Sequence, residues 1–337
     1  MAGNQIVIFT NSRDEHADAL IRTLNGWGHE PFRLNTDDLP ANAYLDFSLT
    51  EGGWKGGIRL RTNGRRMHLE EVKSVWVRRP LSYNFGVELG QPEHQFAFAE
   101  IQHAMAGLWG SLDCFWMSRP SAIRAACWKG EQLQRAARLG FDVPRTLITT
   151  DTEAVREFHA GSGRRIIYKS MAGPSAFTDI SAQWVGTPMI LDFHTTLIEE
   201  SELERIDNVG LTPCLFQEYV EKDLELRVTV IGDEVFAAEI HSQVRDETKI
   251  DFRKYEIDIP YRKACLPWDV ERRCLELVHS YGLTYGAMDL IVTPDGRYVF
   301  LENNPVGQFM FIEQRVPALR MTEALATCLI RGSDGRE

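Results

Sequence analysis

The feature that most constrains this chain is a pair of apolar, strand-forming runs near its end, joined around Asp295 and Gly296. An Asp-Gly pair between two such runs is the strongest short-range signal for a β-hairpin with a two-residue loop. That loop would place Asp289 directly opposite Glu302, with their Cβ atoms about 4.5–5.5 Å apart. Two like charges at this separation destabilise a sheet unless a cation lies between them. The sequence therefore predicts a hairpin that carries a cation site.

A third oxygen ligand follows from strand alternation, which puts Asn304 on the same face as Glu302. Two carboxylates and an amide oxygen suit Mg²⁺, which binds few protein ligands and completes its shell with water and phosphate oxygens. We therefore predict that Asp289, Glu302 and Asn304 hold magnesium. For the hairpin taken alone, the alternative is a solvent-exposed hairpin that merely carries acidic side chains.

The composition limits the partners of the chain. Its 337 residues include 37 Lys and Arg against 48 Asp and Glu, a net charge of −11, which argues against general binding to nucleic acids or anionic membranes. No apolar run has the length of a signal sequence or of a membrane-spanning helix. The six cysteines include no CxxC pair, as in a reduced cytoplasmic protein without a thiolate metal site. We therefore expect a cytoplasmic globular protein of two or three domains.

The first part of the chain has the pattern of a parallel α/β sheet. An apolar strand over residues 5–10 precedes a helix that Asp14 can cap, and a second strand follows. We expect a further strand at 72–77 and a long helix at 91–112, which together make a first domain over residues 1–118. No GxGxxG motif follows the first strand, so the pattern does not predict a dinucleotide site.

The remaining chain divides into a central subdomain, 119–210, and a strand-rich C-terminal subdomain, 211–337, so that the fold class is α/β with an α+β C-terminal part. We expect a helix that Ser121 caps and that runs to Leu139, with Lys129 in its middle. The other elements are expected at 145–149, 152–160, 165–169, 224–231, 234–240, 268–281 and 316–330.

Several polar residues outside the acidic hairpin could serve a nucleotide. Lys169 ends an apolar strand and could face phosphates, with the small-residue loop at 171–176 closing over them; a solvated strand end is the alternative. The strand at 217–220, if it lies at a sheet edge, could offer its backbone to an adenine ring. Glu225 and Arg227 project from one face of their strand, where they could serve ribose and phosphate or pair with each other.

Other enzyme classes lack their motifs in this sequence. The histidines do not have the spacing of a metal site or a catalytic triad, and no nucleophile elbow is present. The motif at 251–253 lies in a polar stretch of mixed charge that a solvated loop would explain. Hydrolase and oxidoreductase readings are therefore not supported.

These signals occur in one order: lysine, lysine, a Gln-Glu-x-Val strand, Glu-x-Arg, Asp and Glu-x-Asn. In this order the chain resembles the ATP-grasp superfamily from about Pro120 to its end. The resemblance implies ATP and Mg²⁺ as cofactors. It implies that Lys129 and Lys169 bind the phosphates, that Glu218, Tyr219 and Val220 contact adenine, and that Glu225 binds ribose. It also implies that Arg227 contacts the γ-phosphate or the substrate carboxyl, and that Asp289, Glu302 and Asn304 bind the metal.

Further segments resemble the microviridin-type, or graspetide, peptide macrocyclases. In the N-terminal domain these are 10–18, 34–40 and 75–80, and further on 144–151, 241–243 and 251–253. The sequence has Asp-Phe-Arg where that group usually has Asp-Trp-Arg. It also has Ala-Ala-Cys-Trp before Lys129 in place of an Asn-rich approach. The resemblance implies an ATP-grasp fold preceded by a small parallel α/β domain, and a homodimer.

The implied activity is activation of an Asp or Glu side chain of a ribosomally made precursor peptide as an acyl phosphate. A Ser or Thr hydroxyl would then give an ω-ester, or a Lys amine an ω-amide. Arg253 and Arg227 are expected to grip the acidic core of the peptide, and Lys169 to assist phosphoryl transfer, because two anions must meet. The alternatives are a carboxylate-amine ligase that adds free amino acids to a peptide or small molecule, and a non-catalytic ATP-binding regulator.

Overall fold

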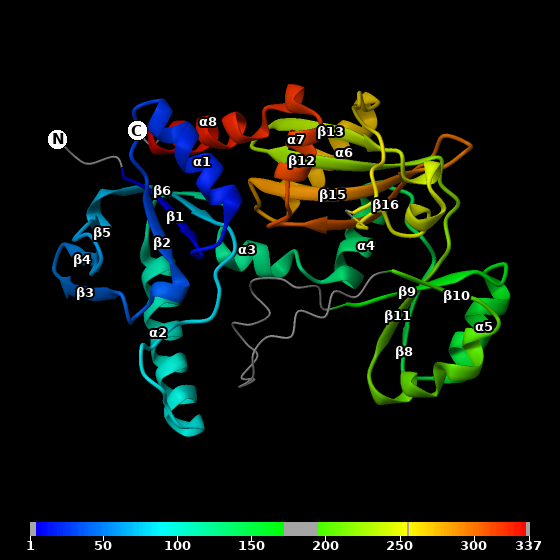
Figure 1. Cartoon of the computed structure of the whole chain (residues 1–337), viewed down its shortest axis with the longest axis horizontal. Helices are drawn as coiled ribbons and strands as arrows, with labels where there is room; N and C mark the ends of the chain where they lie inside the picture. The colour runs from blue at the N-terminus through cyan, green and yellow to red at the C-terminus, as the bar shows by residue number, and fades with distance from the viewer. Residues whose placement is uncertain (1–4, 172–194, 255, 335–337) are drawn as a thin grey trace.

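The computed structural model describes residues 5–171, 195–254 and 256–334 (Figure 1). The small-residue loop expected at 171–176 lies, apart from Met171, outside the described residues. The strands of the described chain form four sheets. In Figure 1 the N-terminal elements lie at one end of the molecule, and the two sheets that follow in sequence lie at the other.

The N-terminal sheet is parallel in the order β2-β1-β6-β7. Its strands are β1 (Gln5–Thr10), β2 (Phe32–Asn35), β6 (Val72–Val77) and β7 (Phe115–Met117). Between β1 and β2 runs α1 (Glu15–Gly26), whose N-cap Asp14 accepts a hydrogen bond from the backbone N–H of His16. The predicted β-α-β opening is therefore confirmed, cap included.

Two additions complete the N-terminal part. An antiparallel sheet forms from β3 (Ala43–Thr50), β4 (Gly53–Leu60) and β5 (Arg66–His68). The long helix α2 (Gln91–Ser111) matches its prediction, and Figure 1 shows one end of it projecting away from the body of the molecule.

The single helix expected from Ser121 to Leu139 is wrong in two respects. The chain forms α3 (Pro120–Ala125) and α4 (Lys129–Arg138), and the N-cap of α3 is Arg119. The break follows from Gln132, whose side-chain amide donates to the carbonyls of Ala126 (2.5 Å) and Asn303 (2.8 Å). Lys129 is consequently the first residue of α4 and does not lie in the middle of a helix.

The small antiparallel sheet has the order β10-β9-β11-β8 and carries α5 (Thr152–Gly161). Its strands are β8 (Thr146–Thr149), β9 (Ile166–Lys169), β10 (Thr196–Ile198) and β11 (Cys214–Glu218). The strand at 217–220 does not lie at the edge of this sheet, because β11 pairs with both β8 and β9. Its strand pairing ends at Glu218, so Tyr219 and Val220 continue beyond the sheet.

The five-stranded antiparallel sheet has the order β14-β13-β12-β15-β16. Its strands are β12 (Leu224–Ile231), β13 (Glu234–Ile240), β14 (Tyr261–Lys263), β15 (Tyr285–Val292) and β16 (Tyr298–Asn304). The β12–β13 register pairs Glu225 with Ile240 and Arg227 with Ala238, so Glu225 and Arg227 lie on one face of β12, as predicted. One face of this sheet packs against α6 (Trp268–Ser280), which buries Val270, Cys274 and Leu277.

The closing helix starts later than expected. A short α7 (Met310–Arg315) and a 3₁₀ turn at Pro317–Leu319 precede α8 (Met321–Asp334), because Pro317 opens the turn and Arg320 adopts a left-handed conformation, with φ 49°. Leu325 and Leu329 of α8 share one buried cluster with Leu20 of α1 and with the inner face of the five-stranded sheet. The end of the chain thus joins the N-terminal sheet to the large antiparallel one (Figure 1).

Candidate active site

One cleft collects most of the residues that the sequence singles out. Its lining includes Lys129, Lys169, Glu218, Tyr219, Val220, Glu225, Arg253, Asp289 and Glu302. Arg227 and Asn304 stand behind this lining and bond to Asp289 and Glu302 respectively. All the predicted site residues therefore lie in one place, although they come from the central and C-terminal parts of the chain.

The acidic hairpin pairs Asp289 with Glu302 as predicted, but not through a two-residue loop. The backbone of Thr293 donates to Arg297, so the loop holds three residues, with Gly296 at φ +81°. Three-residue hairpins place a glycine at this left-handed position. Near the loop the strands are therefore offset by one residue. A register shift between Asp289 and Leu290 removes the offset and restores the acidic pair.

Cations on either side compensate the facing carboxylates. The Arg227 guanidinium lies 2.7 Å from an oxygen of Asp289, and the Lys129 ammonium lies 3.2 Å from Glu302. Burial would raise the pKa of Glu302, but Lys129, Lys169 and Arg253 together lower it to about 2. Burial raises the pKa of Asp289 and Arg227 opposes that shift. The two acids are held against each other by a surplus of positive charge around them.

The donor set fits a divalent cation that binds through oxygen. The Asn304 amide nitrogen donates to a carboxylate oxygen of Glu302 at 3.3 Å, which places a third polar group at the pair. Within the described ranges no three His, Cys, Asp or Glu side chains gather at one point. Two carboxylates with an amide are the ligands of a cation that also takes water and phosphate oxygens, as Mg²⁺ does.

Two lysines face this acidic pair from other elements. Lys129, at the start of α4, donates to the carbonyl of Ser170 at 2.7 Å. Lys169 ends β9 and is half-buried in the cleft. Burial lowers the pKa of Lys169 to about 8, with the nearby charge of Lys129 acting in the same direction and Glu302 opposing. Two ammonium groups beside two carboxylates form a site ready for further negative charge.

Another part of the cleft lining combines a backbone segment with a buried carboxylate. The Glu218 side chain accepts from the backbone N–H of Arg145 at 2.9 Å, which fixes the end of β11. Arg165 covers the Tyr219 ring, with its guanidinium carbon 4.0 Å from the ring centroid. Beyond it, Glu225 is only 5% exposed. This part of the lining therefore offers the segment at the end of β11 together with a buried acidic acceptor.

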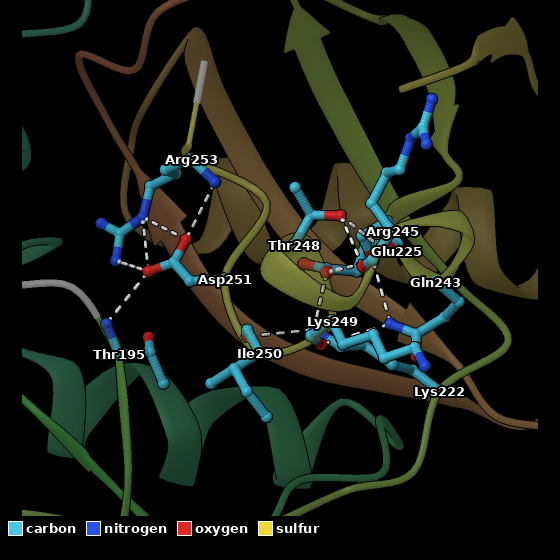
Figure 2. Close-up of polar contacts among 11 residues, drawn as sticks. Thr195, Lys222, Glu225, Gln243, Arg245, Thr248, Lys249, Ile250, Asp251 and Arg253 are labelled. Carbon is cyan, nitrogen blue, oxygen red and sulfur yellow. Dashed lines mark hydrogen bonds and ion pairs between the residues drawn. The ribbon is translucent and has the colours of Figure 1, made fainter. Parts of the chain in front are cut away.

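Arg253 enters the cleft from the loop that follows β13 (Figure 2). Its guanidinium binds the Asp251 carboxylate through Nε at 2.9 Å and through a terminal nitrogen at 2.5 Å. Despite its burial, the pKa of Asp251 lies well below its ordinary value, because Arg253 and two backbone N–H groups stabilise the ionised form. Phe252, the residue between Asp251 and Arg253, is buried in the apolar cluster that includes α8. It occupies the position at which the usual motif has the larger Trp.

Sequence reasoning named Arg227 but not the contacts that hold the chain just after the acidic hairpin. Three side chains donate to three successive carbonyls there: Arg78 to Val306 (2.5 Å), Tyr285 to Gly307 (2.8 Å) and Arg227 to Gln308 (3.0 Å). Arg78 comes from the N-terminal sheet and is 1% exposed. No local sequence signal marks these contacts, because they join residues far apart in the chain.

Lys222 was also missed. It is buried, with its ammonium 2.6 Å from Glu225 and 3.2 Å from the carbonyl of Ile250. The spacing of three residues between Lys222 and Glu225 was the available signal, but it spans the start of a strand, where side chains three apart do not share a face.

The comparisons with known proteins agree with this geometry. A family model described as MvdD pre-ATP grasp domain matches residues 5–124. No curated protein sequence matches the chain. Among solved structures, the macrocyclase MdnC from Microcystis aeruginosa MRC, bound with precursor peptide MdnA, is 30% identical over 97% of this chain and 99% of its own, with a TM-score of 0.82.

Two further structures are similar over nearly the whole chain. A RiPP-associated ATP-grasp ligase from Chryseobacterium gregarium, in complex with ADP and a leader and core peptide, is 29% identical over 97% of this chain and 96% of its own, with a TM-score of 0.84. The macrocyclase MdnB from Microcystis aeruginosa MRC is 26% identical over 97% and 99%, with a TM-score of 0.78.

The fold and the cleft define an ATP-grasp ligase, an enzyme whose α/β N-terminal domain precedes the ATP-grasp part. More narrowly, the chain belongs to the ATP-grasp peptide macrocyclase family of MdnC and MdnB, so the predicted resemblance is confirmed. No helix in the described part of the chain is long and apolar enough to cross a membrane.

Proposed function

We propose that this protein uses ATP and Mg²⁺ to form rings in a ribosomally made precursor peptide, by joining Asp or Glu side chains to Ser or Thr hydroxyls, or to Lys amines. The observation that carries the proposal is the single cleft in which the acidic pair, two lysines and Arg253 meet. A site that brings ATP to a carboxylate must hold two anions together, and this cleft supplies cations at each point where they would meet.

The assignment of roles applies the ATP-grasp resemblance to the residues that line the cleft. Adenine would lie along 218–220 and its ribose would bond to Glu225, which leaves the phosphates between Lys129 and Lys169. Magnesium would be held by Asp289, Glu302 and Asn304, and when bound it would neutralise charge on the β- and γ-phosphates.

Arg253 is the cation for the peptide carboxylate in this scheme, because its guanidinium lines the cleft and Asp251 fixes its orientation. Arg227 is more deeply placed, since it already bonds to Asp289 and to Gln308. We therefore give Arg227 the task of orienting Asp289 and of adding positive field at the γ-phosphate. We also propose three units, at 1–118, 119–210 and 211–337, with the cleft formed by the second and third.

The chemical step balances without a protein nucleophile. A carboxylate oxygen of the peptide attacks the γ-phosphorus, the bond to the β-phosphate oxygen breaks, and ADP leaves. A hydroxyl or amine of the same peptide then attacks the acyl carbon and loses its proton, and phosphate leaves with the oxygen that came from the carboxylate. Lys169 would stabilise the negative charge on the transferring group. Positioning supplies most of the catalysis in such a scheme.

Mass spectrometry of the precursor peptide after incubation with the enzyme, ATP and Mg²⁺ tests the proposal. Each link removes one water from the peptide and produces one ADP. A gain in mass would instead identify a ligase that adds free amino acids. An unchanged mass with ATP bound would identify a non-catalytic regulator, and either result would overturn the proposal.

A further inference from the structure

Lys222 contacts two parts of the cleft, the proposed ribose ligand Glu225 and the loop that carries Arg253. It lies just before β12, lines the cleft, and is 8% exposed. Figure 2 shows its side chain running beneath the loop that carries Arg253. A buried ammonium needs a partner with charge and further hydrogen-bond acceptors, because leaving water is costly.

On the nucleotide side, Lys222 fixes Glu225. Its ammonium lies 2.6 Å from Oε1 of Glu225, and the Ser242 hydroxyl donates to the same oxygen at 2.8 Å. Both bonds fall on Oε1, which leaves Oε2 of Glu225, a cleft-lining residue, as the oxygen that can accept from a ribose hydroxyl. Lys222 and Ser242 therefore set the orientation of the carboxylate from two directions.

On the peptide side, Lys222 fixes the loop of Arg253. Its ammonium donates to the carbonyl of Ile250 at 3.2 Å, one residue before Asp251. Asp251 in turn accepts from the backbone N–H groups of Thr195 and Arg253, each at 3.0 Å, and binds the Arg253 guanidinium. The position of Arg253 thus depends on Asp251, and the backbone next to Asp251 depends on Lys222.

Other contacts of this loop do not replace that link. Thr248 donates to the carbonyl of Ser242 at 2.6 Å, and Gln243 donates to the carbonyl of Lys249 at 3.2 Å. These bonds fold the loop on itself between 242 and 249. Lys222 is the side chain that ties the next residue, Ile250, to the strand that bears the ribose acceptor.

We propose that Lys222 is a shared positioning residue, which orients Glu225 for the ribose of ATP and, through Ile250 and Asp251, Arg253 for the carboxylate of the peptide. The inference rests on the proposed function for the identity of the two ligands. Its consequence is that one side chain, outside contact with the reacting atoms, controls affinity for both substrates.

A pair of variants separates this role from a general structural one. Glu225→Gln keeps an acceptor oxygen but removes the negative charge that strengthens its hydrogen bond to ribose, and it keeps Lys222 on Ile250. Adding Lys222→Met to that variant removes the hydrogen bond to the Ile250 carbonyl, and it leaves no buried carboxylate unpaired because residue 225 is then neutral. We expect Glu225→Gln to weaken binding of Mg·ADP about tenfold or more and to leave binding of a synthetic peptide of Thr and Glu residues within twofold.

The double variant should bind Mg·ADP like Glu225→Gln, but bind the peptide about tenfold more weakly, because non-additivity is confined to the residues in contact. Titration calorimetry measures the first affinity and fluorescence anisotropy of the labelled peptide the second. If Lys222 only stabilised the fold in general, the double variant would bind both Mg·ADP and the peptide more weakly than Glu225→Gln. Lys249→Met is the matched control, since Lys249 lies in the same loop and pairs with Asp246 at the surface, and it should change neither affinity.

Hydrogen–deuterium exchange provides a readout that needs no peptide. Exchange of the backbone N–H groups of Thr195 and Arg253 should accelerate at least threefold in the double variant relative to Glu225→Gln. Equal exchange and equal peptide affinity in the two variants would overturn the role of Lys222. Failure of the wild-type protein to bind any acidic peptide, with the exchange difference present, would count against the proposed function and not against the positioning role.

Discussion

Asp289 on β15 lies directly opposite Glu302 on β16, and a shift of the strand register immediately after Asp289 is what aligns them. The shift leaves Leu301 without a pairing partner in the β15–β16 ladder, next to the acid. Bulges of this kind re-aim side chains at functional sites. Here the result is two carboxylates on one face, with Arg227 on one and Lys129 on the other. In the proposed function, the two carboxylates would hold a metal ion and the neighbouring cations would attract phosphates.

Replacing Glu302 tests the metal assignment. Glu302→Gln keeps the shape of the side chain but removes one of the two carboxylates, so we expect turnover to fall by about 100-fold or more, since a metal ion contributes several kcal/mol to charge stabilisation. Calorimetry should show that Mg²⁺ no longer strengthens nucleotide binding. Asp295→Asn in the exposed loop of the same hairpin is the control and should retain full activity. Full activity of Glu302→Gln would refute the assignment.

The pH dependence of ATP use tests Lys169. Its pKa is lowered from 10.5 to about 8, so the side chain is a cation below pH 8 and neutral above it. We expect kcat/KM for ATP to fall as pH rises through 8, by about tenfold per pH unit in the limit. Lys169→Arg keeps the charge at high pH and should remove this limb. A wild-type profile that is flat from pH 7 to 9.5 would contradict the role.

Arg78 tests how the N-terminal sheet acts on the site. Its burial lowers its pKa to about 10, and its Nε and one terminal nitrogen have no hydrogen-bond partner in the described structure. An apolar side chain of similar length therefore suits the position energetically. We expect Arg78→Met to keep or raise thermal stability while kcat falls about tenfold, because Val306 loses its donor. A large loss of thermal stability, measured by calorimetry, would show that Arg78 stabilises the fold instead.

Gly307 tests the same loop from inside. A Cβ on this residue would lie 2.5 Å from the Cβ of Ala287 and 2.9 Å from the Arg227 guanidinium. Gly307→Ala should therefore displace Arg227 and reduce kcat, with stability lowered by about 1–3 kcal/mol. Gly107→Ala is the contrasting change, because that exposed helical position is open and alanine should stabilise the protein by about 1 kcal/mol. Equal effects of the two substitutions in chemical denaturation would argue against tight packing at Gly307.

Local patterns were sufficient for much of this structure. Asp14 caps α1 and the β12–β13 register follows the Gly232-Asp233 turn, because capping and short turns depend on neighbouring residues. The acidic pair was predicted correctly although its loop was not. The loop closes through Thr293 and Arg297, and the register shift compensates for the difference. The prediction of the pair therefore succeeded through two departures that cancel.

The remaining errors come from contacts across the chain. The break between α3 and α4 depends on Gln132 binding Asn303 of β16, and the interior position of β11 depends on where β8 folds. Arg78 and Lys222 could not be found for the same reason, since each acts on a carbonyl that belongs to another part of the fold. Periodicity and motif spacing contain no record of such pairings.

The most direct test of the account follows one oxygen atom. A precursor peptide whose Asp and Glu carboxylates contain ¹⁸O at both oxygens is incubated with the enzyme, ATP and Mg²⁺, and the released phosphate is analysed by mass spectrometry. If the cleft activates the carboxylate by phosphoryl transfer, each ring formed gives one phosphate that contains one ¹⁸O atom. Rings formed with unlabelled phosphate, or phosphate released without loss of water from the peptide, would contradict the account.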